Sequence, residues 1–178
     1  MNARAIFVLG THHRYQRPST VGAEEFAGVV TAACKDHAVQ SLVEEMSAEA
    51  LAQTREPESV CQRVARALSV HHLFCDLTNA ERLRFGVRDE NLLRSDGFLR
   101  NWTETEIERQ VRASHEIRER HWLARILESD RWPTLFICGA NHVGPFTQAL
   151  HGANVNTILL AGEWTPNPVL QPTTSGGG

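Results

Sequence analysis

Two histidines follow glycines in segments of the same form near opposite ends of the chain. Gly10-Thr11-His12-His13 and Gly139-Ala140-Asn141-His142 both read G-x-x-H, and each comes after a short apolar run. A glycine after a buried strand lets the backbone turn sharply, and the histidine then lies just beyond the strand's carboxyl end. Two neighbouring parallel strands that end in this way would bring both imidazoles to one point. Paired neutral imidazoles are common ligands of transition metals, so the two histidines are candidate metal ligands; the alternative is two unrelated turn residues.

Acidic residues end the apolar runs that lie between these two segments. Glu44 and Glu45 end the second run, and Asp76 ends the third. Adjacent strand residues face opposite ways, so only one of Glu44 and Glu45 can face the histidines, and we expect the other in solvent. Asp76 could ligate a metal, orient a histidine, pair with Arg118, or merely cap the helix that follows.

An arginine occupies the apolar side of the longest predicted helix, which starts at a capping box whose first residue is Thr103. At about 100° per residue, Arg118 falls between Ile107 and Val111. A guanidinium keeps its proton, so an inward arginine needs a carboxylate or an anionic ligand. We therefore expect Arg118 either to pair with an internal carboxylate or to bind substrate. Its neighbour Glu119 is interpreted as a surface residue at the margin of the inward side.

Short apolar runs alternate with amphipathic helical patterns, which predicts an α/β fold: a mainly parallel central sheet with helices on both faces, in one compact domain. Active residues belong at the carboxyl ends of such strands. The domain is expected to span residues 1–164, and 165–178 to form a flexible tail. The expected strands are 5–9, 39–43, 70–75, 135–138 and 155–160, and the expected helices are 20–35, about 57–68, 79–85 and 103–128.

Composition narrows the class of protein. A chain of 178 residues with 42% hydrophobic content fits one globular domain. The net charge of -3, with arginines mixed among glutamates, argues against a nucleic-acid partner. The four cysteines form no C-x-x-C pair and are expected to be reduced core thiols. The apolar run before Gly10 is too short for a signal peptide or a membrane span. We expect a soluble cytoplasmic protein without a membrane partner.

The order of these motifs resembles the superfamily that unites TraB/PrgY pheromone-shutdown proteins, Tiki metalloproteases, ChaN-like proteins and erythromycin esterases. The family's G-T-x-H is similar to the segment ending at His13, and its strand-end glutamate to Glu44, with Glu45 as the register alternative. Its Arg-Asp-x-x-Met segment resembles 118–122, where glutamate replaces aspartate and tryptophan replaces methionine. Its closing G-x-x-H, followed by leucine and then glycine, resembles 139–152.

A further match concerns the middle of the chain, and together the matches cover about residues 5–160. The aspartate that ends a middle strand in TraB-like members resembles Asp76, which is followed by Arg82 or Arg84. The resemblance implies a divalent-metal hydrolase, such as a peptidase or an esterase. The implied metal ligands are His13, His142 and Glu44, and the implied catalytic residues are Glu44, Glu45, Asp76, Arg118 and Glu119.

The chemistry of such a site is consistent with hydrolysis. A divalent ion such as Mn, Co or Zn, held by two histidines and a carboxylate, keeps positions free for water and lowers that water's pKa toward ~7. A glutamate would accept the proton, while Arg118 would bind a carboxylate of a peptide or small-molecule substrate or steady the oxyanion. The same ligands could hold iron(II) for oxygen chemistry. The alternative is a non-catalytic domain that binds an anionic small molecule or belongs to a larger complex. An oligomer is possible under either hypothesis.

Overall fold

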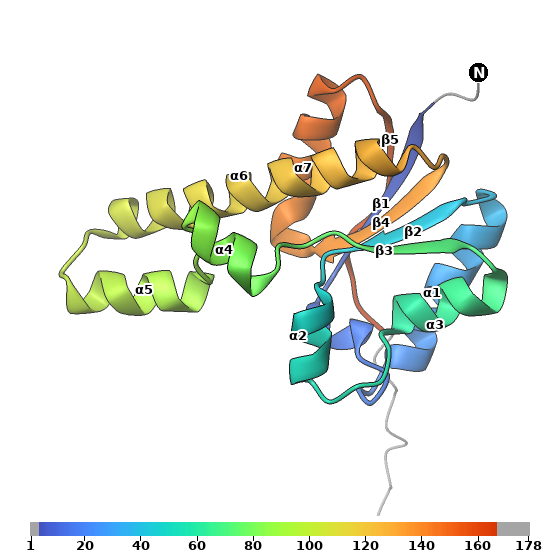
Figure 1. Ribbon diagram of the computed structural model, residues 1–178, viewed down its shortest axis with the longest axis horizontal. Helices are drawn as coiled ribbons and strands as arrows, with labels where there is room; N and C mark the ends of the chain where they lie inside the picture. Colours follow the sequence, from blue (N-terminus) through green and yellow to red (C-terminus); the bar gives the residue numbers. More distant parts are fainter. Residues whose placement is uncertain (1–3, 167–178) are drawn as a thin grey trace, which may run out of the picture.

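Five parallel strands form the centre of the molecule in the computed structural model, which describes residues 4–166 (Figure 1). Their order across the sheet is β3-β2-β4-β1-β5. Each expected strand is present, with ends shifted by a few residues, which confirms the predicted parallel α/β fold. The part of the expected tail from 167 onward lies outside the described residues. The strands are β1 (Ala5–Thr11), β2 (Ser41–Glu44), β3 (His71–Phe74), β4 (Thr134–Gly139) and β5 (Asn156–Trp164).

Helices cover both faces of the sheet because the strands carry apolar side chains on both faces. Phe7 and Leu9 of β1 pack with helices α1 (Ala23–Asp36) and α3 (Val60–Leu68). Ile6 and Val8 belong to the opposite core, with helices α6 (Glu104–Ser129) and α7 (Ala140–Gly152). The side chains of β1 alternate between the two faces of the sheet, and helices exclude water from both faces. β1 is therefore almost wholly buried.

Three helices were not expected from the sequence: α2 (Ala48–Gln53), α5 (Glu90–Leu99) and α7. Helix α4 (Asn79–Phe85) was expected and has the predicted bounds. Helix α5 and the first half of α6 extend away from the sheet as a pair that we call the arm (Figure 1). The arm has a small core of its own, formed by Leu93, Trp102, Ile107 and Val111. None of the helices in residues 4–166 is both long and apolar enough to cross a membrane.

Candidate functional site

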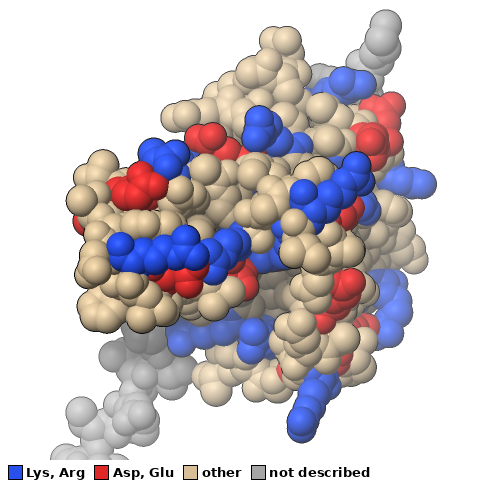
Figure 2. Space-filling view, turned by 60° about the vertical axis from the view of Figure 1, so that its left-hand side comes forward, with Lys and Arg blue, Asp and Glu red and all other residues tan. Residues whose placement is uncertain are grey.

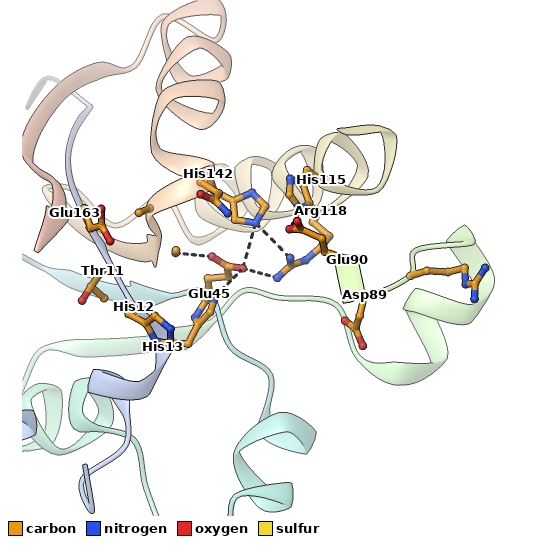
Figure 3. Close-up of a pocket in the computed structure, with 14 residues that line it drawn as sticks. Thr11, His12, His13, Glu45, Asp89, Glu90, His115, Arg118, His142 and Glu163 are labelled. Carbon is orange, nitrogen blue, oxygen red and sulfur yellow. Dashed lines mark hydrogen bonds and ion pairs between the residues drawn. The ribbon is translucent and has the colours of Figure 1, made fainter. Parts of the chain in front are cut away.

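The carboxyl ends of three neighbouring strands bring the chemically active residues together. β4 lies between β1 and β2, with Thr11 opposite Gly139 and Glu44 opposite Ile137. The residues that follow these strands therefore leave the sheet at one edge. His13 begins the short 3-10 helix η1 (His13–Gln16) after β1, Glu45 follows β2, and His142 lies in the first turn of α7. Figure 3 shows the three side chains converging on one pocket.

The two motif histidines meet at one carboxylate oxygen. The Nε2 atoms of His13 and His142 each lie 3.5 Å from Glu45 Oε1, so the two nitrogens are separated by at most twice that distance, about 7 Å. The side chains line a cavity of about 310 Å³. The structure therefore confirms the expected convergence of the two G-x-x-H segments at the carboxyl edge of a parallel sheet.

The glycine of each motif provides space that a side chain would fill. A Cβ on Gly139 would lie 3.1 Å from His13 Nε2 and 3.4 Å from Glu45 Oε2, so this glycine leaves room for the site residues. A Cβ on Gly10 would lie 2.0 Å from the carbonyl oxygen of Gly162, where β5 approaches β1. Both glycines permit a close approach of main chain and side chain, as the sequence pattern predicted.

Glu45, and not Glu44, faces the histidines. The backbone N–H of Gly139 donates to Glu45 Oε2 at 2.7 Å, and Arg118 donates to Oε1. The ligand position expected for Glu44 is therefore corrected. Glu44 points to the opposite face of the sheet, where Ser59 donates to its carboxylate and His72 Nε2 lies 2.8 Å from Oε1. It is also buried and not solvated as expected, because α3 covers that face.

Arg118 lies inside the site, as its angular position on α6 predicted. Its Nε donates to Asp76 Oδ1 at 3.0 Å, and its Nη2 donates to Asp76 Oδ2 at 2.9 Å and to Glu45. Its Nη1 lies 3.4 Å from His142 Nε2. Of the roles considered for Asp76, the structure shows the pairing with Arg118, and Arg82 donates to the same carboxylate. Most of the guanidinium donors are thus engaged within the protein, which argues against Arg118 as the binder of a substrate carboxylate.

Charge pairing keeps the two buried acids of this network ionised. Burial alone would raise the pKa of Glu45, but the neighbouring His13, Arg118 and His142 outweigh burial and lower it below its ordinary value. Burial likewise opposes ionisation of Asp76, yet Arg118 and Arg82 hold the pKa of Asp76 well below its usual range. The same carboxylates raise the pKa of Arg118 despite the burial of its guanidinium. The network therefore carries fixed charges at neutral pH.

Glu119 is buried, so its interpretation as a surface residue is wrong. Its Oε1 lies 2.9 Å from His142 Nδ1. An ionised carboxylate only accepts hydrogen bonds, so the proton of a neutral His142 resides on Nδ1, and Nε2 carries the lone pair. The contact depends on the inward placement of α7, which the sequence did not reveal. Glu119 thereby orients His142 toward Glu45 and the pocket.

Two further side chains of α6 belong to the site and were not predicted. His115 lines the pocket, and its ring centroid lies 4.3 Å from that of His142. Burial first, and then His142 and Arg118, lower the pKa of His115. Trp122 donates to Asp76 Oδ1 at 3.0 Å, and its ring lies under the guanidinium of Arg118. His115 stands three residues before Arg118, a spacing that places two side chains on one helix face and could have revealed it.

The residues present do not fit the metal centre that the family resemblance implies. Within residues 4–166, no group of three or more His, Cys, Asp or Glu side chains is arranged to hold a metal ion. Arg118 contacts both Glu45 Oε1 and His142 Nε2, so a permanent cation already stands beside two atoms that a metal would need. Its charge neutralises the carboxylate that would otherwise attract the ion. The divalent-metal ion stays a prediction.

Comparison of the chain with family models, with characterised proteins and with solved structures found no match. The resemblance to the TraB and Tiki superfamily therefore rests on the motifs alone.

Proposed function

We propose that this protein is a hydrolase in which His142, supported by Glu119, activates a water molecule. The observation that carries the proposal is the buried contact between Glu119 Oε1 and His142 Nδ1, which leaves Nε2 as the basic nitrogen on the pocket side of the ring, between Glu45 Oε1 and Arg118 Nη1. A carboxylate that holds an imidazole in one tautomer also stabilises the imidazolium that forms when the base takes a proton. Here Glu45 lies on the other side of the ring, so the imidazolium would be flanked by two carboxylates.

His13 and Glu45 lie beside His142, the proposed base. The His13 side chain is 47% exposed, whereas that of His142 is 5% exposed. His13 is therefore the histidine that substrate and water reach first, and it is suited to hold the water by a hydrogen bond. Glu45 cannot move freely, since Arg118 and the Gly139 N–H fix both of its oxygens. Its role is to keep the two imidazoles aligned, since both Nε2 atoms lie 3.5 Å from its Oε1.

The first turn of α7 supplies hydrogen-bond donors for developing negative charge. Ala140 and Asn141 line the pocket, and as the first residues of the helix their N–H groups have no acceptor within it. Such donors, together with the positive end of the helix dipole, favour an oxyanion. A general base beside an oxyanion-binding turn is suited to acyl transfer to water. The substrate class is accordingly a carboxylic ester or a peptide amide.

The test is hydrolysis of a panel of chromogenic esters and short peptides by protein purified without added metal. On any substrate that is turned over, Glu119→Gln should lower kcat by about 10²- to 10⁴-fold, because the amide no longer fixes or stabilises the protonated base. The matched control is Glu116→Gln, a substitution of the exposed glutamate three residues earlier on α6, which should change kcat less than about twofold. Thermal melting of both variants verifies that they are folded.

Two results would overturn the mechanism. Full turnover by Glu119→Gln would remove the role of the carboxylate-oriented base. Activity that disappears with a chelator and returns with Mn, Co or Zn would instead establish the metal-bound water expected from the family resemblance. Elemental analysis of the same preparation shows, without reference to a substrate, whether the protein holds a metal ion.

A further inference from the structure

The pocket at the proposed base continues into a larger hollow. The smaller chamber has a volume of about 310 Å³ and reaches His142 and the first turn of α7, whereas the larger has about 890 Å³ and reaches α2. Figure 2 shows the surface hollowed below the arm, with acidic and basic side chains around the hollow. A substrate bound at His142 can extend into both chambers because they share a lining. The shared residues are His12, His13, Glu45, Asp89, Glu90 and Arg118.

Ion pairs within the protein neutralise the charged side chains of these chambers, with two exceptions among residues 4–166. Arg118 pairs with Glu45 and Asp76. The exceptions are Glu163 in the smaller chamber and Arg17 in the larger one. A charged ligand is bound best by groups whose charge is still free, so these two side chains indicate which charges an occupant carries. The other paired side chains are Arg82, Arg88, Asp89 and Glu90.

Glu163 presents a free carboxylate to the smaller chamber. The residue after it, Trp164, packs against Tyr15 and Phe26 on the α1 face of the sheet. Adjacent strand residues face opposite ways, so Glu163 faces the side of the sheet where the chamber lies. Figure 3 shows it on the side of the pocket opposite Asp89. An exposed, unpaired carboxylate in this position fits a cationic group, such as the amino end of a peptide, which is protonated at neutral pH.

Arg17 presents a free guanidinium to the larger chamber. It follows η1 directly, and its main-chain N–H donates to the carbonyl oxygen of Arg14 at 3.1 Å. Its guanidinium differs from those of Arg82 and Arg118 in having no carboxylate partner in the described part of the chain. The N–H donors of a guanidinium form a fork that matches the two oxygens of a carboxylate. Arg17 is therefore suited to bind a substrate carboxylate, the role that the ion pairs of Arg118 argue against.

The two free charges are close enough for one small molecule to contact both. Trp164 pairs with Thr11 in the sheet, so Glu163 lies beside the end of β1. Strand spacing, the short segment to His13 and the rise of η1 place the Cα atoms of Glu163 and Arg17 within about 24 Å of each other. An extended peptide covers about 3.3–3.6 Å per residue, so no more than about seven residues fit between them.

We infer that the substrate is a short peptide with both ends free, whose terminal ammonium pairs with Glu163 and whose terminal carboxylate pairs with Arg17. This role presupposes the proposed hydrolase function. The first carbonyl then lies in the smaller chamber with the donors of Ala140 and Asn141, and the rest of the peptide occupies the larger chamber.

The reaction in this orientation removes the first residue of the peptide. His142 Nε2 takes a proton from water while the water oxygen bonds to the carbonyl carbon. The carbon–nitrogen bond then breaks, and the proton passes from His142 to the leaving nitrogen. The products are a free amino acid and a peptide one residue shorter, which again carries an ammonium and a carboxylate.

Calorimetric titration of Glu119→Gln protein with trialanine tests the inference without turnover. N-acetylation or carboxyl-terminal amidation of the peptide removes one charge, and each should weaken binding about 10-fold, the effect of losing one hydrogen bond to a charged group. Adding Glu163→Gln should abolish the penalty for acetylation and keep that for amidation, and adding Arg17→Gln should do the reverse. Each variant is thus the matched control of the other. Arg66→Gln, a change at an exposed residue of α3, should leave both penalties unchanged.

Release of alanine from the same peptides by the wild type separates this inference from the hydrolase proposal. The blocked peptides should show kcat/KM values lower by the same factors as their binding. Binding with both penalties but without release of alanine would keep the assignment of the two charges and contradict the hydrolase. Equal hydrolysis of free and blocked peptides would overturn the inference and leave the hydrolase intact. Trialanine that does not bind at millimolar concentration, or penalties that survive in Glu163→Gln and Arg17→Gln, would also overturn it.

Discussion

Replacement of Arg118 by alanine should be among the most damaging single changes in this protein. Arg118 is the only arginine or lysine that contacts Glu45 among residues 4–166, and Glu45 has no exposed side-chain surface. Asp76 is affected less, because Arg82 and Trp122 still donate to it after the change. The substitution therefore leaves one buried carboxylate with the Gly139 N–H and two imidazoles, and no fixed positive charge.

The expected loss follows from breaking a buried ion pair on one side. Removal of one partner from such a pair typically destabilises a protein by 3–5 kcal/mol, and the surviving contacts of Asp76 place Arg118→Ala near the lower limit, about 3 kcal/mol. For a chain of this size, that loss corresponds to a decrease in Tm of about 6–12 °C. Arg66→Ala is the control, since the Arg66 side chain is 73% exposed and, within residues 4–166, forms an ion pair with Glu58 alone. A surface pair of this kind contributes at most about 1 kcal/mol.

Urea unfolding followed by circular dichroism measures both variants under one condition. The double variant Arg118→Ala with Glu45→Gln should recover part of the lost free energy of unfolding, because the orphaned charge is gone. Equal destabilisation by Arg118→Ala and Arg66→Ala would refute the reasoning. So would the absence of any recovery in the double variant, since the loss would then arise from packing and not from the unpaired carboxylate.

Two further predictions concern acid stability and the first motif glycine. The pKa values of Glu45 and Asp76 lie below their ordinary values of 4.5 and 3.8, so both groups stabilise the fold fully above those values. That stabilisation is lost as the pH falls through the pKa values of the folded state. Glu45→Gln should therefore reduce the slope at acid pH in a plot of unfolding free energy against pH. An unchanged slope would contradict a lowered pKa for Glu45. Gly10→Ala should destabilise by about 1–3 kcal/mol through its clash with Gly162, whereas Gly28→Ala, in open space on α1, should stabilise by about 0.5–1 kcal/mol. Equal melting temperatures for the two glycine variants would show that β5 can move away from β1.

The fold class and the meeting of the two histidines were predictable from the sequence. Short apolar runs are buried on both faces only in a sheet covered by helices, and parallel strands place their carboxyl ends at one edge. His13 and His142 follow two such runs, which the sheet order makes neighbours. The inward position of Arg118 was predictable for a similar reason, because helical periodicity fixes which residues share a side. These inferences use only local geometry that repeats along the chain.

The tertiary structure alone decided which acidic residues complete the site. Strand alternation requires Glu44 and Glu45 to face opposite ways, but β2 is buried on both faces, so the pattern of apolar residues does not distinguish them. The choice depends on α6 and α7 covering one face and α3 the other. Glu119 and His115 became site residues only when α7 brought His142 against α6. Such contacts join residues far apart in sequence, and no periodic pattern encodes them because they arise from the packing of whole elements.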